Sequence, residues 1–156
     1  MTPDPMIPRL DLLCRATVEL GPPILIGPTP LGERRIIPIT GGRVEGGRLG
    51  GEVLPGGADW QIVRADGAAV LEARYCVRTA DGALVFVENR GLRVGPPDVL
   101  ARLARGEHVA PGEYYFRTTP RFETASPGYA WLNSVVAVGS AVRSPDAVIL
   151  DFYVVS

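Results

Sequence analysis

A set of acidic, basic, aromatic and amide side chains in this sequence has the types needed to bind a small organic molecule and act on it. Asp59 and Glu123 are candidate acid or base catalysts, because burial favours the neutral form of a carboxyl group and brings its pKa toward neutral pH. Arg74 or Arg117 is the candidate for holding an anionic intermediate, since a guanidinium group offers paired N–H donors. The predicted ligand-binding residues are Arg34, Trp60, Tyr75, Tyr115, Arg117, Tyr129, Trp131 and Asn133.

The expected roles follow from residue type. Arginine would bind a carboxylate, enolate or phenolate, tyrosine and asparagine would orient a carbonyl, and aromatic faces would enclose a ring. Each residue also has an ordinary structural reading: Asp59 would cap a turn, Arg74 would pair with Glu72 or Asp59, and the aromatic side chains would form core or an interface. As a set they favour a ligand site, because a charge inside a small barrel lowers stability unless it is paired or used.

Several familiar chemistries are absent from the sequence. His108 is the only histidine, and one histidine without a cysteine pair cannot build the usual metal cluster. All basic side chains are arginine, so Schiff-base chemistry and a P-loop lysine are excluded. No Gly-x-Ser-x-Gly nucleophile motif occurs. The sequence therefore predicts no metal and no cofactor.

The stretch Gly41–Trp60 must position part of the candidate set. Glycine recurs in it between short apolar pieces with strand character, and glycine is favoured where backbone bends or lies close to another strand. We expect strongly curved β-structure that closes on itself and delivers Asp59 and Trp60 to a fixed place.

The rest of the chain reads as consecutive strands. Residues Leu10–Leu20 alternate apolar and polar side chains, as in a half-buried antiparallel strand, and Asp66-Gly67 and Asp81-Gly82 are hairpin turn pairs. A short helix is expected between Asp98 and Gly106, as a plug or flap at a barrel end. The other predicted strands are Glu33–Thr40, Ala68–Thr79, Ala83–Asn89, Glu113–Glu123, Tyr129–Val142 and Ala147–Val155.

This pattern predicts an all-β fold, a single antiparallel β-barrel of about 8–10 strands, lipocalin- or calycin-like, with one short helix. Residues 1–9 are expected to form an irregular arm and residues 10–156 the barrel. Alternation places Tyr115 and Arg117 on one face of their strand, and Tyr129, Trp131 and Asn133 on one face of theirs. Either face could be a cavity wall or an interface.

Composition narrows the class of partner. The formal net charge is −1, which argues against nucleic acid, and no apolar segment approaches the roughly 20 residues of a membrane helix. No signal peptide begins the chain, and Cys14 and Cys76 lie in apolar, strand-like stretches that suit reduced, buried thiols. We expect a cytoplasmic protein whose partner is a small molecule.

A series of motifs in this order resembles the domain of unknown function 3237 family. The resemblance runs from about Leu10 to the C-terminus. It implies an antiparallel β-barrel, often found as an oligomer, so that a homo-oligomer (dimer or higher) is expected here, and it implies no assigned reaction. The motifs are Gly32–Arg34, Ile37–Gly42, Pro55–Trp60, Ala73–Tyr75, Tyr114–Thr118, Pro120–Thr124 and Tyr129–Asn133.

Three functions remain open on the sequence. The first is a barrel that binds a small carbonyl- or carboxylate-bearing molecule in its interior. The second is a cofactor-independent lyase, isomerase or hydrolase that uses Asp59 or Glu123 as acid or base. The third is a structural oligomer whose polar cluster is only an interface network.

Overall fold

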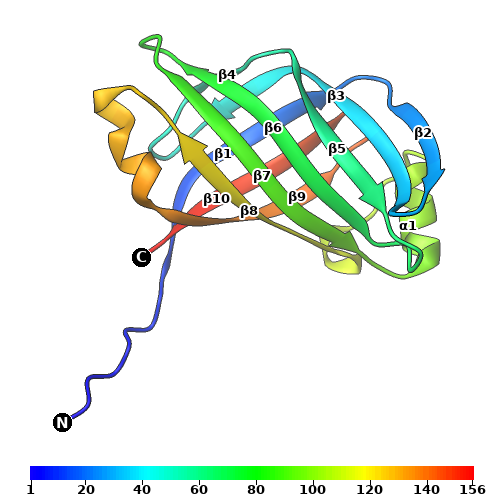
Figure 1. Ribbon diagram of the computed structural model, residues 1–156, viewed down its shortest axis with the longest axis horizontal. Coiled ribbons are helices and arrows are strands. Elements are labelled where there is room, and N and C mark those ends of the chain that lie inside the picture. Colours follow the sequence, from blue (N-terminus) through cyan, green and yellow to red (C-terminus); the bar gives the residue numbers. More distant parts are fainter.

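A computed structural model describes residues 1–156, in which ten strands form one antiparallel β-barrel (Figure 1). Residues 1–9 precede the first strand as an exposed, extended arm. The strands are β1 (Leu10–Leu20), β2 (Ile24–Thr29), β3 (Gly32–Glu45), β4 (Gly51–Val53), β5 (Gly57–Val63), β6 (Ala69–Thr79), β7 (Leu84–Val94), β8 (Tyr115–Glu123), β9 (Val136–Arg143) and β10 (Ala147–Val155).

The sheet closes because β1 pairs with β10 on one side and with β3 on the other. The order around the barrel is β1, β10, β9, β8, β7, β6, then β4 and β5 in turn, then β3, which gives a closed eight-stranded barrel with two extra strands. Strand β2 pairs only with β3, beyond the closed part. The predicted single antiparallel barrel is confirmed.

Glycines make the closure possible where strands change partners. Gly42 of β3 lies opposite Val18 of β1 and has a φ of +136°; a Cβ there would come within 2.0 Å of the carbonyl oxygen of Thr17. Gly51 of β4 approaches the carbonyl oxygen of Arg78 in the same way, at 2.1 Å. Only glycine permits these close approaches. The predicted strand at Glu33 therefore continues through the glycines to Glu45.

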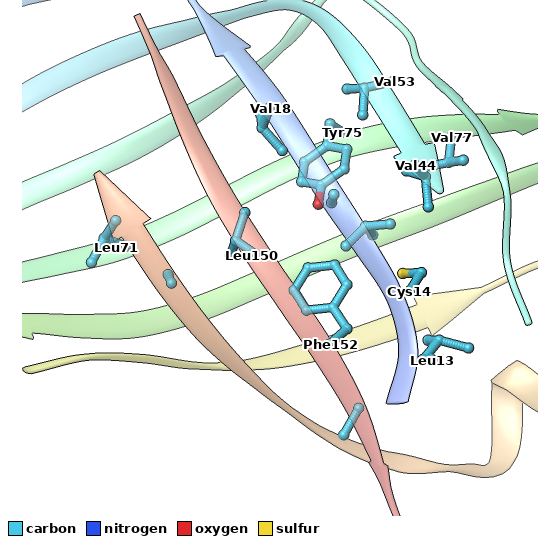
Figure 2. Close-up of a cluster of buried hydrophobic side chains, with 14 of the residues drawn as sticks. Leu13, Cys14, Val18, Val44, Val53, Leu71, Tyr75, Val77, Leu150 and Phe152 are labelled. Atoms are coloured by element: carbon cyan, nitrogen blue, oxygen red, sulfur yellow. The ribbon is translucent and has the colours of Figure 1, made fainter. Parts of the chain in front are cut away.

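The apolar core fills one part of the barrel interior. Inward positions alternate along each strand, and their side chains form one cluster of buried residues. Figure 2 shows part of it, with Val18, Leu71, Leu150 and Phe152 around the interior. Phe152 packs edge-on against Phe122, with ring centroids 6.0 Å apart. Most of the buried polar side chains lie toward the other part of the interior.

The two ends of the barrel are covered by different elements (Figure 1). The α-helix α1 (Pro97–Ala104) lies at one end; Val99 is its buried residue. A 3₁₀-helix, η2 (Pro127–Ser134), lies at the other and inserts Leu132, which is 1% exposed, into the core. A short 3₁₀ turn, η1 (Pro111–Glu113), precedes β8. No helix of the structure is long and apolar enough to cross a membrane.

One predicted strand is wrong over its first half. Residues expected to begin a long strand at Tyr129 instead form η2, and β9 begins only at Val136. Pro127-Gly128 opens this segment, and burial of Leu132 at the end of the barrel stabilises a helical turn that alternation cannot reveal. Strand β7 also runs past the predicted end at Asn89 to Val94.

Candidate binding site in the barrel lumen

The lumen is the interior space between the core and the end that carries α1. Its mouth, beside α1, is a cavity of about 840 Å³, which exceeds the roughly 300 Å³ at the lower limit of ligand sites. A narrower inner part, with about 40 Å³ of free space, continues toward the core. The two parts share Leu20, Ile37, Arg93 and Arg143, so they form one continuous space.

Three arginines from different strands meet in the lumen, and we call them the arginine cluster: Arg35 of β3, Arg93 of β7 and Arg143 of β9. Each occupies an inward position, because it lies on the same strand face as a buried residue of its own strand. These buried residues are Ile37 on β3, Asn89 on β7 and Ala141 on β9. None of the three forms an ion pair with a carboxylate. Like charges are thus concentrated in the one place where solvent is least able to screen them.

The electrostatics of the arginine cluster follow from burial and from mutual repulsion. Burial, and after it the guanidinium groups of Arg143 and Arg35, lower the pKa of Arg93 to about 10. Burial and Arg35 also lower the pKa of Arg143. Arg93 still carries its charge at neutral pH, and its guanidinium carbon lies 5.5 Å from the Phe116 ring centroid. The lumen therefore has a net positive charge suited to an anion.

Asp59 is the buried acidic group of the inner part of the lumen and is 6% exposed, whereas the carboxylates of Glu33 and Asp146 lie at the mouth. Its Oδ1 accepts a hydrogen bond from the backbone N–H of Glu72 (2.9 Å), and its Oδ2 accepts one from Nε2 of Gln61 (3.0 Å). The Gln61 side chain in turn accepts a hydrogen bond from Arg35. Burial raises the pKa of Asp59, although these hydrogen bonds and the nearby arginines oppose the shift. A carboxyl group held this way can bind or release a proton inside the lumen.

A second polar group lies at the inner part of the lumen and carries no charge. Tyr75, Asn89 and Thr118 are each no more than 5% exposed. The hydroxyl oxygens of Tyr75 and Thr118 and the carboxamide oxygen of Asn89 have no hydrogen-bond partner in the protein. The Nε atom of Arg35 is also buried without a hydrogen-bond partner. Buried polar atoms are nearly always partnered, so four such atoms around one lumen mark it as unusual.

The structure brings two of the predicted site residues, Asp59 and Tyr75, into the lumen. Both lie on the inner faces of their strands, β5 and β6. Trp60 follows Asp59 in β5 and so points outward, where it is 42% exposed. Arg34 lies outside too, and its Nη1 donates to the carbonyl oxygen of Trp60 at 2.8 Å. The glycine stretch thus delivers Asp59 to the interior but not its neighbour.

The other predicted catalytic residues lie on the outer wall. Arg74 pairs there with Glu72, at 2.6 Å between Nη2 and Oε1, which is the structural alternative considered from the sequence. Glu123 is exposed at the end of β8. On β8 the predicted cavity face of Tyr115 and Arg117 is the outer one, because Phe116 and Thr118 point inward. Alternation gave the two faces correctly but not which one was inside.

The last three predicted ligand-binding residues lie on η2, at the end of the barrel opposite the mouth. The guanidinium carbon of Arg48 lies 4.0 Å from the Trp131 ring centroid. Asn133 accepts a hydrogen bond from the Thr124 N–H (2.8 Å) and donates one to its carbonyl oxygen (2.9 Å). Tyr129 is half-buried there. These side chains hold η2 in place and do not line the lumen.

Sequence reasoning missed the arginine cluster together with Gln61, Asn89 and Thr118. A signal was present: Arg35 lies on the same strand face as Ile37 and Ile39, and Asn89 lies on the same face as Val85 and Val87. Arg93 and Arg143 lie beyond the predicted strand ends, so the strand face to which their side chains belong was not considered. The structure groups no three histidine, cysteine, aspartate or glutamate side chains that could hold a metal ion.

The fold and the lumen place this protein among small, closed antiparallel β-barrels with a polar interior. The model of the family described as "Protein of unknown function (DUF3237)" matches residues 8–155, and the chain belongs to this family. A UPF0311 protein of Rhodopseudomonas palustris is 50% identical over 88% of this chain and 90% of its own.

A solved structure and a more distant relative extend the comparison. The crystal structure of a conserved protein of unknown function from Rhodopseudomonas palustris superposes with a TM-score of 0.94 at 45% identity, covering 97% of this chain and all of that one. A hydroalkoxylation enzyme of Penicillium herquei is 26% identical over 96% of this chain and 85% of its own length.

Proposed function

We propose that the protein binds a small organic molecule with an anionic oxygen in its lumen. The arginine cluster would hold a carboxylate, enolate or phenolate through charge-assisted hydrogen bonds. The observation that carries this proposal is that Arg35, Arg93 and Arg143 line one cavity of about 840 Å³ and that none of them forms an ion pair with a carboxylate. Partly buried cations without an ion-pair partner lower stability, and a bound anion would offset that penalty.

The apolar part of the same ligand would lie against the inner wall of the lumen. Val18, Leu71 and Leu150 line the inner part, and Leu100 and Leu103 of α1 line the mouth. Ligand sites commonly combine such apolar walls with a few polar groups that fix orientation. A ring or short chain with an anionic oxygen is the class of molecule that suits both surfaces.

A second candidate function, catalysis without a cofactor, is favoured by Asp59. Burial raises the pKa of Asp59, and this carboxyl group lies in the same space as cations that would stabilise an oxyanion. The relative from Penicillium herquei is named for hydroalkoxylation, the addition of O–H across a carbon–carbon double bond. Asp59 would give its proton to one carbon, the hydroxyl oxygen would bond to the other, and the hydroxyl proton would return to the carboxylate.

Native mass spectrometry of the purified protein tests binding first, because it weighs both the assembly and any co-purified small molecule. Isothermal titration with 3-phenylpropionate then measures affinity for a simple carboxylate. We expect Arg93→Gln to weaken binding by about 10- to 100-fold, since hydrogen bonds to charged groups contribute about 1.5–3 kcal/mol. Arg90→Gln is the matched control, because Arg90 lies on the outer face of the same strand.

The outcomes separate the two candidates. Equal affinity in wild type, Arg93→Gln and Arg90→Gln would rule out anion binding by the arginine cluster. If a bound molecule is turned over, Asp59→Asn should abolish turnover while binding persists. Turnover that continues unchanged in Asp59→Asn would show that this carboxyl group is not the proton donor.

A further inference from the structure

The neutral polar group of the lumen, Tyr75, Asn89 and Thr118, lies in the inner part and is not part of the arginine cluster. We propose that these three residues form a second subsite, which binds a hydroxyl group at the far end of the same ligand. This inference rests on the proposed function, because it describes the other end of the molecule that the arginine cluster would hold. It narrows the ligand to a hydroxylated organic anion.

The first argument is the pattern of unpartnered atoms. The Tyr75 hydroxyl, the Asn89 carboxamide oxygen and the Thr118 hydroxyl are all buried, and all three residues line the inner part of the lumen. Figure 2 shows the Tyr75 side chain among the buried side chains of the barrel interior. The Asn89 oxygen accepts hydrogen bonds only, so its partner must be a donor. A hydroxyl group, which donates and accepts, satisfies all three side chains.

The second argument is strand register, which puts Asn89 and Thr118 side by side. On β7 and β8, Asn89 lies opposite Pro120 and Gly91 lies opposite Thr118. Asn89 and Thr118 are therefore diagonal neighbours on the inner face, within reach of one shared group. Asp59 lies in the same row as Asn89, with only the small side chain of Ala73 between them. The register thus places the subsite next to the acid.

The third argument is that the flanking residues are small enough to leave Thr118 room. Gly91 and Gly139 lie opposite Thr118 on the two neighbouring strands. A Cβ on Gly139 would come within 2.2 Å of the Thr118 hydroxyl oxygen, and one on Gly91 within 2.6 Å of its methyl carbon. Any other residue at either position would displace the Thr118 side chain. The hydroxyl is therefore held in place by its surroundings rather than by a hydrogen bond.

The dimensions fit the tip of a ligand rather than a whole one. The inner part offers about 40 Å³ of free space, enough for a functional group but not a ring, whereas the mouth offers about 840 Å³. Along β7, Arg93 lies about 7 Å from Gly91, the residue opposite Thr118, and about 13 Å from Asn89. A carboxylate and a hydroxyl on opposite sides of one ring span a comparable distance.

Matched pairs of probes that differ by one hydroxyl test the subsite by isothermal titration calorimetry. The anionic pair is 3-(4-hydroxyphenyl)propionate and 3-phenylpropionate, and the neutral pair is 4-ethylphenol and ethylbenzene. In wild type we expect the hydroxylated member of each pair to bind about tenfold more tightly. Thr118→Val and Tyr75→Phe, which keep side-chain shape, should bring that ratio close to one. Thr119→Val is the matched control, because Thr119 is exposed on the outer face of the same strand.

The two pairs separate the failure of this inference from the failure of the proposed function. If the anions bind in an Arg93-dependent way but the hydroxyl gives no advantage in either pair, the subsite is refuted and anion binding stands. If the anions do not bind but the neutral pair shows a preference that Thr118→Val removes, the subsite stands and anion binding is refuted. No hydroxyl preference in any pair, with thermal midpoints unchanged in the variants, overturns the subsite outright.

Discussion

The outer wall and the lumen of this barrel use the same strands but treat charge in opposite ways. On β7, Nε of the outward Arg90 lies 3.2 Å from Oε1 of Glu88, whereas the inward Arg93 has no ionic partner. The outer wall repeats such pairs, for example Arg78 with Glu52 at 2.6 Å and Arg15 with Asp151 at 2.7 Å. The lumen holds the three cations of the arginine cluster and one buried acid, Asp59, while the carboxylates of Glu33 and Asp146 lie at the mouth without forming an ion pair with the cluster.

This difference shows where the fold tolerates a loss of stability. Exposed ion pairs contribute about 0–1 kcal/mol each, so the pairs on the outer wall add little to the stability of the fold. Unpaired charges and unpartnered polar atoms in the lumen are costly, and protein interiors seldom contain them without a use. Arg48 and Arg117 on the outside also lack an ion pair, so the lumen differs from the wall because its unpaired cations are gathered in one partly buried space.

The largest expected effect comes from removing a cation of the lumen. Arg93→Met should raise the free energy of unfolding by about 1–2 kcal/mol, because an apolar side chain relieves burial of an unpaired charge and repulsion from Arg35 and Arg143. Urea denaturation of the purified variant measures this. A loss of stability instead would mean that the guanidinium group is structural, and would break the contrast between lumen and wall.

A smaller effect is expected in the pH dependence of stability at Asp59. Burial raises its pKa in the folded state above the unfolded value of 3.8, so the folded state binds more protons in the window between the two. The unfolding free energy of wild type should therefore fall as pH rises through that window, by about 1.4 kcal/mol for each pKa unit of difference. The Asp59→Asn variant should lack this fall when both are denatured in urea at several pH values.

Asp66 provides the control of opposite sign for that experiment. Arg64 lowers its pKa to about 2, so its stabilising contribution is present above pH 3.8 and is lost as pH falls toward 2. The difference between wild type and Asp66→Asn should thus appear at lower pH than the difference for Asp59→Asn. Coincident profiles for the two variants would contradict the environment assigned to Asp59.

The smallest effect is expected on the outer wall. Arg74→Gln removes the pair with Glu72 and should change the unfolding free energy by less than about 0.5 kcal/mol, since both side chains are partly exposed to solvent. Ligand affinity should not change, because Arg74 lies outside the lumen. A clear loss of binding in this variant, measured by the same titration as for Arg93→Gln, would show that Arg74 contributes to ligand binding.

The fold was predictable from sequence because its signals are local. Alternation defined Leu10–Leu20 and Ala147–Val155 with the boundaries that the structure has for β1 and β10. Asp-Gly pairs at Asp66 and Asp81 mark the turns on either side of β6, where glycine takes a positive φ. The segment from Tyr129 failed because burial of Leu132 at the end of the barrel, a long-range contact, decides its structure.

The site was less predictable because its decisive feature contradicts a general rule. Arginine is mostly found on surfaces, so an arginine that alternates with apolar residues is normally taken for the outward one. On β8, both faces carry an aromatic side chain, and Tyr115 looks as suitable as Phe116 for a cavity wall. Asp59 was found because the glycine stretch pointed to it. The arginine cluster needed the register of several strands, which no single strand contains.

The unequal ends of the barrel have a kinetic consequence. Leu132 seals the end under η2, whereas the mouth is bordered by the eight-residue α1, which buries only Val99 fully. Whatever occupies the interior must come and go past that single short helix. A ligand held in the lumen would therefore leave past α1, and loosening this helix would be expected to speed dissociation.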